Sequence, residues 1–280
     1  MTHKIILLVI TCALSASLSS CSSDTQEGDP NYFSQSQISV RMKDETMLYL
    51  SDTGNGTAMI SYDRSNPLHL NQDNKSQLTT YVGQLVIPAT VTSQGNTYQI
   101  TGIDEMAFAN NTTLTSLTLP ESITTIGQGA FMNCSALVSV NIPTGVTAIP
   151  SSCFAQCKKM TKFELPEGIK NIGTLAFANC GKMTSITIPE GVNEIADRAF
   201  LGCTAVKELT IPSSVNKMGG NVFFRASKLT KIHLKATTPP ELTDSLGDYI
   251  SKATLYVPTG CKTAYEENTL WNKFKSIIEE

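Results

Sequence analysis

The sequence predicts an α+β repeat solenoid, a chain wound into stacked coils of 23 residues, because three rows of residues recur at this interval in one phase. Proline keeps the step from Pro120 to Pro212, and leucine or isoleucine stands directly before each proline. The third row consists of phenylalanines, namely Phe108, Phe131, Phe154, Phe177, Phe200 and Phe223. A fixed period of about 20–50 residues is typical of repeat proteins, whose neighbouring units bury a shared core.

Each unit is expected to contain two short extended segments and one tight turn. Residues 114–134, LTSLTLPESITTIGQGAFMNC, show the pattern. Residues 117–119 alternate apolar and polar, which predicts a short strand with one face inward. Pro120 ends this strand, because proline has no N–H for a ladder. Residues 126–127 indicate a second extended piece, and residues 130–131 a helical turn. We therefore expect the phenylalanine rings to stack inside the coils as an aromatic spine.

One further position of the unit carries cysteine in four successive coils, at Cys134, Cys157, Cys180 and Cys203. Asn111 and Ala226 hold this position in the flanking coils. We interpret the thiols as small buried groups that pack in the core. Two alternatives stay open. Disulfides between neighbours would need distortion, because parallel side chains keep their Cβ atoms apart, and a zinc site would need ligands that converge on one point.

The unit resembles the BspA-type (Treponema pallidum-type) leucine-rich repeat, which combines a length of 23 residues with Leu-Pro, Ile-Gly and Ala-Phe-x-x-Cys motifs. The match covers about residues 100–258, and Pro150 and Ala196 stand where the signature has glycine. The resemblance implies a leucine-rich-repeat solenoid. It also implies adhesion to host or bacterial surface proteins, extracellular matrix among them.

The flanking segments are expected to cap the two ends of the stack, since an open end would pair with other chains. Residues 36–99 contain alternating stretches such as MLYL and LVIPATVT, and SQGN before TYQI suggests a hairpin. This predicts a β-rich N-terminal cap. Residues 259–280 are expected to form a helical C-terminal cap, because four apolar residues fall on one helical face: Trp271, Phe274, Ile277 and Ile278.

Residues 1–20 are interpreted as a lipoprotein signal peptide, because a basic start precedes an apolar run that is too short to span a bilayer. LSSC, which ends at Cys21, resembles the bacterial lipobox; this implies lipidation of Cys21 and attachment to the outer membrane through lipid alone. Ordinary secretion is the alternative. Residues 21–35 are polar and read as a flexible tether. The acidic residues of this tether resemble the surface-export signal of some Gram-negative lipoproteins, which implies an exterior location.

The sequence indicates no enzyme, no cofactor and no metal site. After the signal peptide only His69 and His233 remain, and neither has an evident Ser or Cys partner. No phosphate-binding glycine loop or paired metal-ligand motif is present. No basic stripe stands out along the chain, which argues against nucleic acid as a partner.

The outward positions of the predicted strands form a polar face, which is the candidate surface for binding proteins. Its members are Ser139, Asn141, Lys162, Glu164, Ser185, Thr187, Glu208, Thr210, Lys231 and His233. The alternative is a face that only keeps the solenoid soluble. Two other functions stay open. One is glycan capture in an outer-membrane uptake system, for which the sequence offers few aromatics, and the other is a structural role in the envelope.

Overall fold

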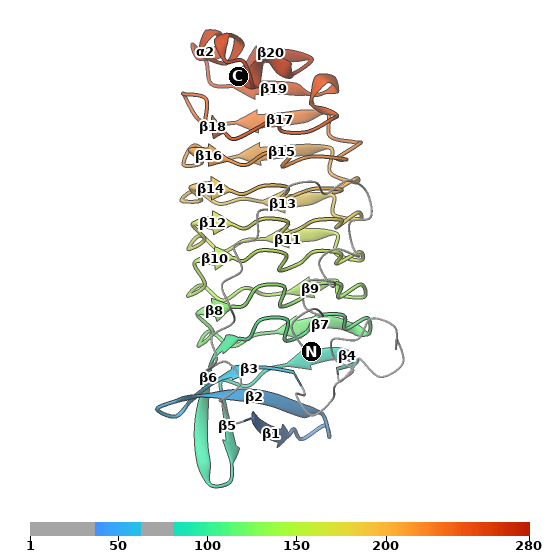
Figure 1. Ribbon diagram of the computed structural model, residues 1–280, viewed down its shortest axis with the longest axis vertical. Coiled ribbons are helices and arrows are strands. Elements are labelled where there is room, and N and C mark those ends of the chain that lie inside the picture. Colours follow the sequence, from blue (N-terminus) through green and yellow to red (C-terminus); the bar gives the residue numbers. More distant parts are fainter. Residues whose placement is uncertain (1–36, 63–80) are drawn as a thin grey trace, which may run out of the picture.

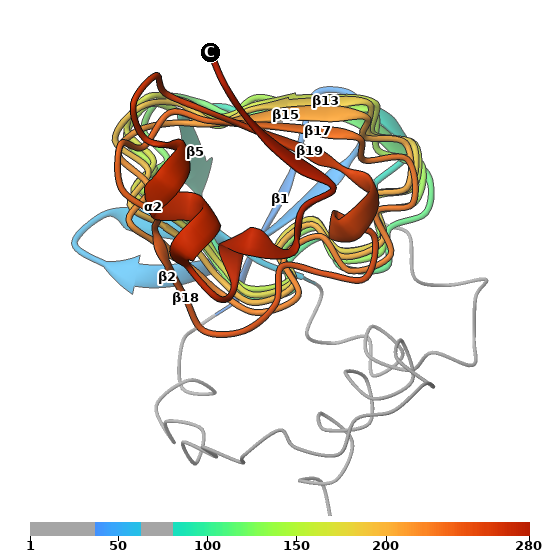
Figure 2. The ribbon, with the colours of Figure 1, turned by 90° about the horizontal axis from the view of Figure 1, so that it is seen from above.

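The computed structural model describes residues 37–62 and 81–280, which build an elongated stack of coils (Figure 1). Each coil gives one strand to a first sheet and, after a turn, a shorter strand to a second sheet. Viewed along the long axis, the coils lie almost directly over one another (Figure 2). The predicted winding in 23-residue coils is confirmed, and strands and turns, not helices, form its sides.

The first sheet contains the longer strand of each coil. In chain order its strands are β4 (Gly83–Val86), β7 (Leu114–Thr118), β9 (Ser139–Val140), β11 (Lys162–Glu164), β13 (Ser185–Thr187), β15 (Glu208–Ile211), β17 (Lys231–Leu234) and β19 (Thr254–Val257). From β7 to β19 the paired strands are parallel with a step of 23 residues, while β4 pairs with β7 at a step of 32. Lys162 lies beside Ser185, and Glu208 beside Lys231. The ladder is divided into three hydrogen-bonded blocks.

The second sheet is built from two-residue strands that follow the proline turns. Its strands are β10 (Ala148–Ile149), β12 (Asn171–Ile172), β14 (Glu194–Ile195), β16 (Lys217–Met218) and β18 (Glu241–Leu242). In the coil before them the equivalent strand, β8 (Thr125–Ile126), pairs with the N-terminal sheet. Glu194 lies beside Lys217, 23 residues on, but Lys217 lies beside Glu241. The last coil therefore holds one extra residue before β18, in the stretch KATTPPE, where the sequence pattern also fades.

The six phenylalanines form the predicted aromatic spine. Neighbouring ring centroids are 5.1–6.0 Å apart, and the planes of neighbouring rings deviate from parallel by no more than 11°. All six side chains are buried. Tyr81 packs on Phe108 at 5.3 Å and extends the row towards the N-terminal end. Stacking at one ring per coil thus covers both faces of each interior ring with apolar surface.

The cysteine column is also inside the coils, and the structure has these residues as free thiols. Each Sγ donates to the carbonyl oxygen of the phenylalanine 26 residues earlier, at 3.0–3.3 Å. In the coil before Cys134, Asn111 takes the place of the cysteine, and its Oδ1 accepts a hydrogen bond from the N–H of Leu114 at 2.8 Å. Packing plus a weak hydrogen bond to the previous coil accounts for the column, as the core interpretation expects.

Backbone geometry explains the residue types at two positions of the coil. The turn after each phenylalanine has a residue with positive φ, which asparagine or glycine supplies in four coils, at Asn110, Asn133, Asn179 and Gly202. At Gly127 a Cβ atom would lie 2.3 Å from the backbone nitrogen of Glu105 in the previous coil. The backbone therefore needs local adjustment where Ala196 replaces this glycine.

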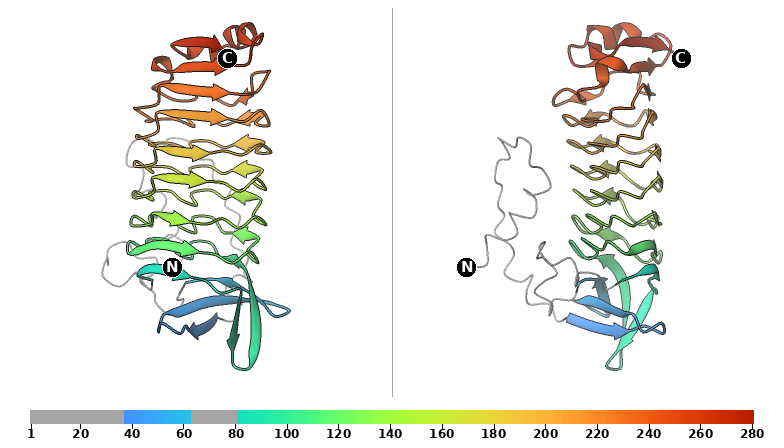
Figure 3. Two further views of the ribbon diagram at one scale, coloured as in Figure 1. Left: turned by 180° about the vertical axis from the view of Figure 1, so that it is seen from behind. Right: turned by 90° about the vertical axis from the view of Figure 1, so that its right-hand side faces the viewer.

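The N-terminal region is β-rich, as predicted. Besides β4 it contains β1 (Gln37–Arg41), β2 (Met47–Gly54), β3 (Thr57–Ile60), β5 (Thr90–Ser93) and β6 (Asn96–Ile103), in the sheet order β1-β2-β3-β6-β5. β5 and β6 form the expected hairpin, and its two turn residues, Gln94 and Gly95, both have positive φ. β6 also pairs with β8, which joins this sheet to the coils at the lower end of the stack (Figure 3).

The predicted helical C-terminal cap is wrong for most of its length. An α-helix, α2, covers only Lys262–Glu267, and two single 3₁₀ turns, η3 and η4, cover Ile250–Lys252 and Trp271–Lys273. The chain then forms β20 (Ser276–Glu279), which pairs in parallel with β19 and extends the first sheet. Within the described residues the fold is a β-solenoid with this one α-helix.

The apolar residues of this segment explain the error. Trp271, Phe274 and Ile277 are buried, as a docked helix would have them, but Ile278 is 44% exposed. In β20 successive side chains point to opposite sides of the sheet, so neighbouring residues cannot share one face. The pairing of Leu255 with Ile277 keeps Ile277 inside. The energy of strand pairing and burial here overrides the helical spacing.

Candidate binding surface

The first sheet presents a polar face to solvent, and the ten predicted residues lie on it in two columns. In β11, Lys162 and Glu164 are exposed while Phe163 between them is buried. β13 and β15 repeat this alternation. Nine of the ten residues are exposed, and His233 is half-buried. The structure therefore gathers residues that are up to 94 positions apart into one surface, which runs from β9 to β17.

Asn141 differs from its neighbours, because both ends of its amide are occupied. Nδ2 donates to the carbonyl oxygen of Leu119 at 2.9 Å, and Oδ1 accepts from the Leu119 N–H at 2.7 Å. These bonds continue the ladder between two coils just where β9 ends at Val140. Asn141 therefore holds two coils together, and these bonds fix the orientation of its amide.

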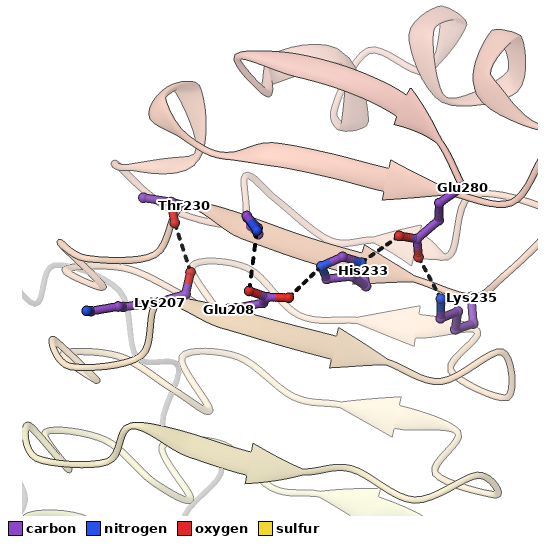
Figure 4. Close-up of polar contacts among 7 residues, drawn as sticks. Lys207, Glu208, Thr230, His233, Lys235 and Glu280 are labelled. Carbon is purple, nitrogen blue, oxygen red and sulfur yellow. Dashed lines mark hydrogen bonds and ion pairs between the residues drawn. The ribbon is translucent and has the colours of Figure 1, made fainter.

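His233 is held in a polar cluster at the C-terminal end of the face (Figure 4). Its Nε2 lies 2.9 Å from Glu208 Oε1, and its Nδ1 lies 2.8 Å from Glu280 Oε2. The imidazole stacks on Tyr256 with the ring centroids 4.5 Å apart. Lys235 Nζ donates to Glu280 Oε1 at 2.6 Å. The cluster thus links β15 and β17 to the residue that follows β20. It was not predicted, because its members are distant in the sequence.

Glu280 should make the docking of the last strand dependent on pH. The hydrogen bond from Lys235 lowers the pKa of Glu280, with His233 acting in the same direction. A carboxylate with a lowered pKa stabilises the fold above its unfolded pKa, about 4.3, and this contribution is lost as the pH falls through the lower, folded value. We expect Glu280→Gln to reduce stability at pH 7 by less than about 1 kcal/mol, because the pair is exposed.

Hydrogen exchange of the β20 amides is the measurement for this effect. The amides of Ile277 and Glu279 should exchange faster in Glu280→Gln than in the parent at pH 7. The difference should shrink towards zero in acid, below the folded pKa of Glu280. Glu267→Gln, at an exposed position in α2, is the matched control. A difference between Glu280→Gln and the parent that persists unchanged in acid would contradict the electrostatic explanation.

Three valines on or beside the N-terminal strands of the first sheet were not identified as site residues from the sequence. Val82, Val86 and Val138 are 73%, 63% and 45% exposed. Val86 lies beside Thr118 in the ladder between β4 and β7, so it points outward like the polar columns. The alternation in β4, where Leu85 is buried, was the signal that could have located Val86. These side chains add apolar surface to an otherwise polar face.

The column thiols are predicted to be chemically inert in the folded protein. Burial raises the pKa of Cys134 and of Cys180 to about 12, and it also raises the pKa of Cys157 and Cys203 well above the usual value of a thiol. Since the thiolate is the nucleophile, native protein at pH 8 should react with iodoacetamide at the partly exposed Cys261 and not at the column. Peptide mass spectrometry before and after urea unfolding measures this; rapid native modification of Cys157 would contradict it.

Several other sequence-based expectations receive no test from the structure. Cys21, His69 and the predicted signal peptide and tether lie outside the described residues. Within residues 37–62 and 81–280 no cluster of three or more His, Cys, Asp or Glu side chains could hold a metal ion. None of the helices in this part of the chain has the length and apolar character to cross a bilayer.

Solved structures with the same fold come from bacteria. A leucine rich cell surface protein from Faecalibacterium prausnitzii matches with a TM-score of 0.53 and 20% identity, over 87% of this chain and 73% of that protein. The T. pallidum leucine rich repeat protein matches with a TM-score of 0.58 and 19% identity, over 86% of this chain and 94% of that one. At these identities the likeness concerns the fold alone.

Among curated proteins no significant match is found. The family model described as BspA type leucine rich repeat region matches in six copies, over residues 89–201 and 175–249. These ranges cover more than half of the chain, and they coincide with the coils that carry the phenylalanine spine. The chain therefore belongs to the BspA-type leucine-rich repeat family.

Proposed function

We propose that the protein is a lipid-anchored cell-surface protein whose first sheet binds proteins of the host or of other bacteria, such as extracellular matrix. One observation supports this proposal above others: the outward face of the first sheet is continuous and exposed. A leucine-rich-repeat solenoid is an architecture suited to protein interaction, since stacked coils present an extended rigid surface.

The composition of the face suits a protein partner. Val86 supplies an exposed apolar group at its N-terminal end, and the exposed Val138 lies directly before β9. Charged side chains of both signs follow along β11 to β17, including Lys162 and Glu164. Apolar contacts surrounded by polar groups are the usual composition of protein interfaces. Asn141 and His233 contribute less, because their polar atoms are already engaged within the solenoid.

The location rests on the sequence of the first residues together with the related structure. The F. prausnitzii protein of the same fold is described as a cell surface protein. Here LSSC at Cys21 supplies an expected lipidation site, and the polar residues 21–35 would hold the solenoid away from the membrane. Two or more acyl chains are enough for stable attachment without a spanning helix.

The binding proposal is tested with purified full chain in mild detergent on immobilised matrix and bacterial surface proteins. We expect saturable binding by the parent. The double variant Glu164→Lys and Thr187→Lys should bind with an affinity lower by about tenfold or more, because unpaired positive charge buried in an interface disrupts it. The control pair, Glu167→Lys and Asn193→Lys, makes the same charge changes at exposed residues outside the first sheet. Absence of saturable binding, or an equal loss in both pairs, would reject the proposal.

The lipid anchor has its own test. Cys21→Ala should move the protein from the membrane fraction to the soluble fraction of the producing cells, and surface labelling of intact cells should fall with it. An unchanged distribution between the two fractions would remove the lipoprotein part of the proposal and leave the binding part standing.

A further inference from the structure

A second surface of the solenoid carries a concentration of positive charge that is hidden in the linear sequence. Four segments, spaced 23 residues apart, lead into the first-sheet strands β11, β13, β15 and β17: residues 158–162, 181–185, 204–208 and 227–231. Together they contain seven of the chain's 21 basic residues and one of its 24 acidic residues. The chain as a whole has a net charge of −3, so the distribution is strongly uneven.

We call this surface the lysine edge, and its members are Lys158, Lys159, Lys162, Lys182, Lys207, Lys228 and Lys231. All seven side chains are exposed. Lys207 at the start of β15 points away from the His233 cluster (Figure 4). The two preceding coils carry no charge in the equivalent segments, 112–116 and 135–139. The sequence shows no basic stripe because the solenoid, and not the chain order, brings these residues together.

The lysine edge is poorly neutralised by the protein itself. Within the described residues only Lys231 has an ion-pair partner, Glu208 at 3.7 Å, and that carboxylate is also shared with His233. Elsewhere on the solenoid lysines have closer partners, such as Lys217 with Glu194 at 3.0 Å. The remaining six ammonium groups of the edge are left for solvent counterions or an external anion.

The geometry of the edge is linear. Residues 23 positions apart lie in adjacent coils, so Lys159 and Lys182 occupy neighbouring steps of a stack whose strands are about 4.8 Å apart. Lys228 lies two coils beyond Lys182; the coil between them has Ala205 in the equivalent position and carries its lysine, Lys207, two residues later. Like charges on adjacent strands destabilise the isolated protein. A row of charge that costs stability and parallels the long axis fits an extended ligand with regularly repeated negative charges.

We infer that the lysine edge binds a linear anionic polysaccharide, with sulfate or carboxylate groups, laid along the solenoid axis. Lysine suits such a ligand, because an ammonium group on a flexible stem binds as a point charge and does not require the fixed planar geometry of arginine. The site is separate from the proposed protein-binding columns except at Lys162 and Lys231, and the inference does not depend on that proposal.

Other ligands fit the edge less well. Neutral sugars and single-stranded nucleic acids need aromatic platforms for stacking. Phe163, directly after Lys162, is buried. Phe224, three residues before the last segment, is partly exposed, and the guanidinium of Arg225 lies over its ring, 5.5 Å from the centroid. Duplex DNA is recognised by a helix or ribbon that enters a groove, and the turns at the edge form neither. An extended polyanion needs only the row of charge.

The test compares the purified full chain in mild detergent with two variants of equal net charge. The edge variant combines Lys158→Gln, Lys159→Gln, Lys182→Gln and Lys228→Gln, none of which belongs to the protein-binding columns. The control variant combines Lys43→Gln, Lys170→Gln, Lys273→Gln and Lys275→Gln, which are also exposed. The probes are immobilised heparin and polygalacturonate, which distinguish sulfate from carboxylate recognition, with poly-glutamate and duplex DNA as competing polyanions.

We expect the parent and the control variant to bind heparin or polygalacturonate at about 150 mM salt, with affinity that falls as salt rises. The edge variant should bind about tenfold or more weakly, since four ion pairs of modest individual strength are lost. Its melting temperature should be equal or higher, because repulsion is relieved. No binding of the parent, an equal loss in the control variant, or stronger binding of poly-glutamate or DNA would overturn the inference.

Discussion

Phe154→Ala is expected to lower the free energy of unfolding by about 3–5 kcal/mol, the range for truncation of a fully buried phenylalanine. The Phe154 side chain has no solvent exposure and lies between Phe131 and Phe177, with ring centroids 5.1 and 5.5 Å away. Phe163 packs on it from the first sheet at 4.8 Å. Removal of the ring leaves a cavity that adjacent coils can close only by breaking the ladders that hold them in register.

Urea unfolding followed by circular dichroism measures this loss. Since each coil contacts only its neighbours, the cavity at mid-stack should also split the transition, because the two halves become less strongly coupled. Phe154→Leu should cost less, as it refills part of the volume, and Thr147→Ala at an exposed position should have little effect. A loss below about 1 kcal/mol for Phe154→Ala would show that the spine is not the main core of the stack.

The spine and the thiol column could be predicted because they depend only on periodicity. When a chain repeats at 23 residues, positions of equal phase must stack, whatever the details of each turn. Spacing alone therefore predicted that Phe154 and Cys157 lie inside the coil, and both are buried. The same reasoning gave the two columns of the polar face, because alternation along a strand fixes which residues point outward.

Features that depend on where the repeat stops could not be predicted in this way. The apolar residues of segment 276–279 are compatible with a helix or a strand. The segment forms a strand because it pairs with the open edge of β19. The contact of His233 with Glu280 follows from that pairing, across 47 residues. The lysine edge could not be predicted for another reason. Its lysines occupy several adjacent positions of the repeat and therefore form no regular row in the sequence, and they share one surface only in the wound coil.

The C-terminal end of the stack should depend strongly on Trp271, and Trp271→Ala is expected to remove about 3–5 kcal/mol from the stability of this region. The indole has no solvent exposure, and its Nε1 donates to the carbonyl oxygen of Pro240 at 2.9 Å. Tyr265 packs edge-on against the indole at 5.7 Å, and Phe274 stacks on it at 6.2 Å. The residue therefore ties α2 and the approach to β20 onto the last coil.

Loss of this contact should expose the edge of β19, because Trp271 anchors the segment that leads into β20. The remaining contacts of β20 are its ladder, the Glu280 cluster and polar bonds, such as those from the N–H groups of Gly260 and Lys262 to Glu279 Oε1. An uncovered parallel strand in a flat sheet is a template for pairing with another chain. We therefore expect Trp271→Ala to show two effects together, a separate early unfolding transition and concentration-dependent association in sedimentation velocity.

Trp271→Phe keeps an aromatic ring at this position but loses the hydrogen bond to Pro240, so it should cost about 1–3 kcal/mol of stability and stay monomeric at the same concentrations. Asn272→Ala, at the exposed neighbouring position, is the control. If Trp271→Ala kept the parent's stability and sedimentation, the segment after β19 would not be the cap that closes the solenoid.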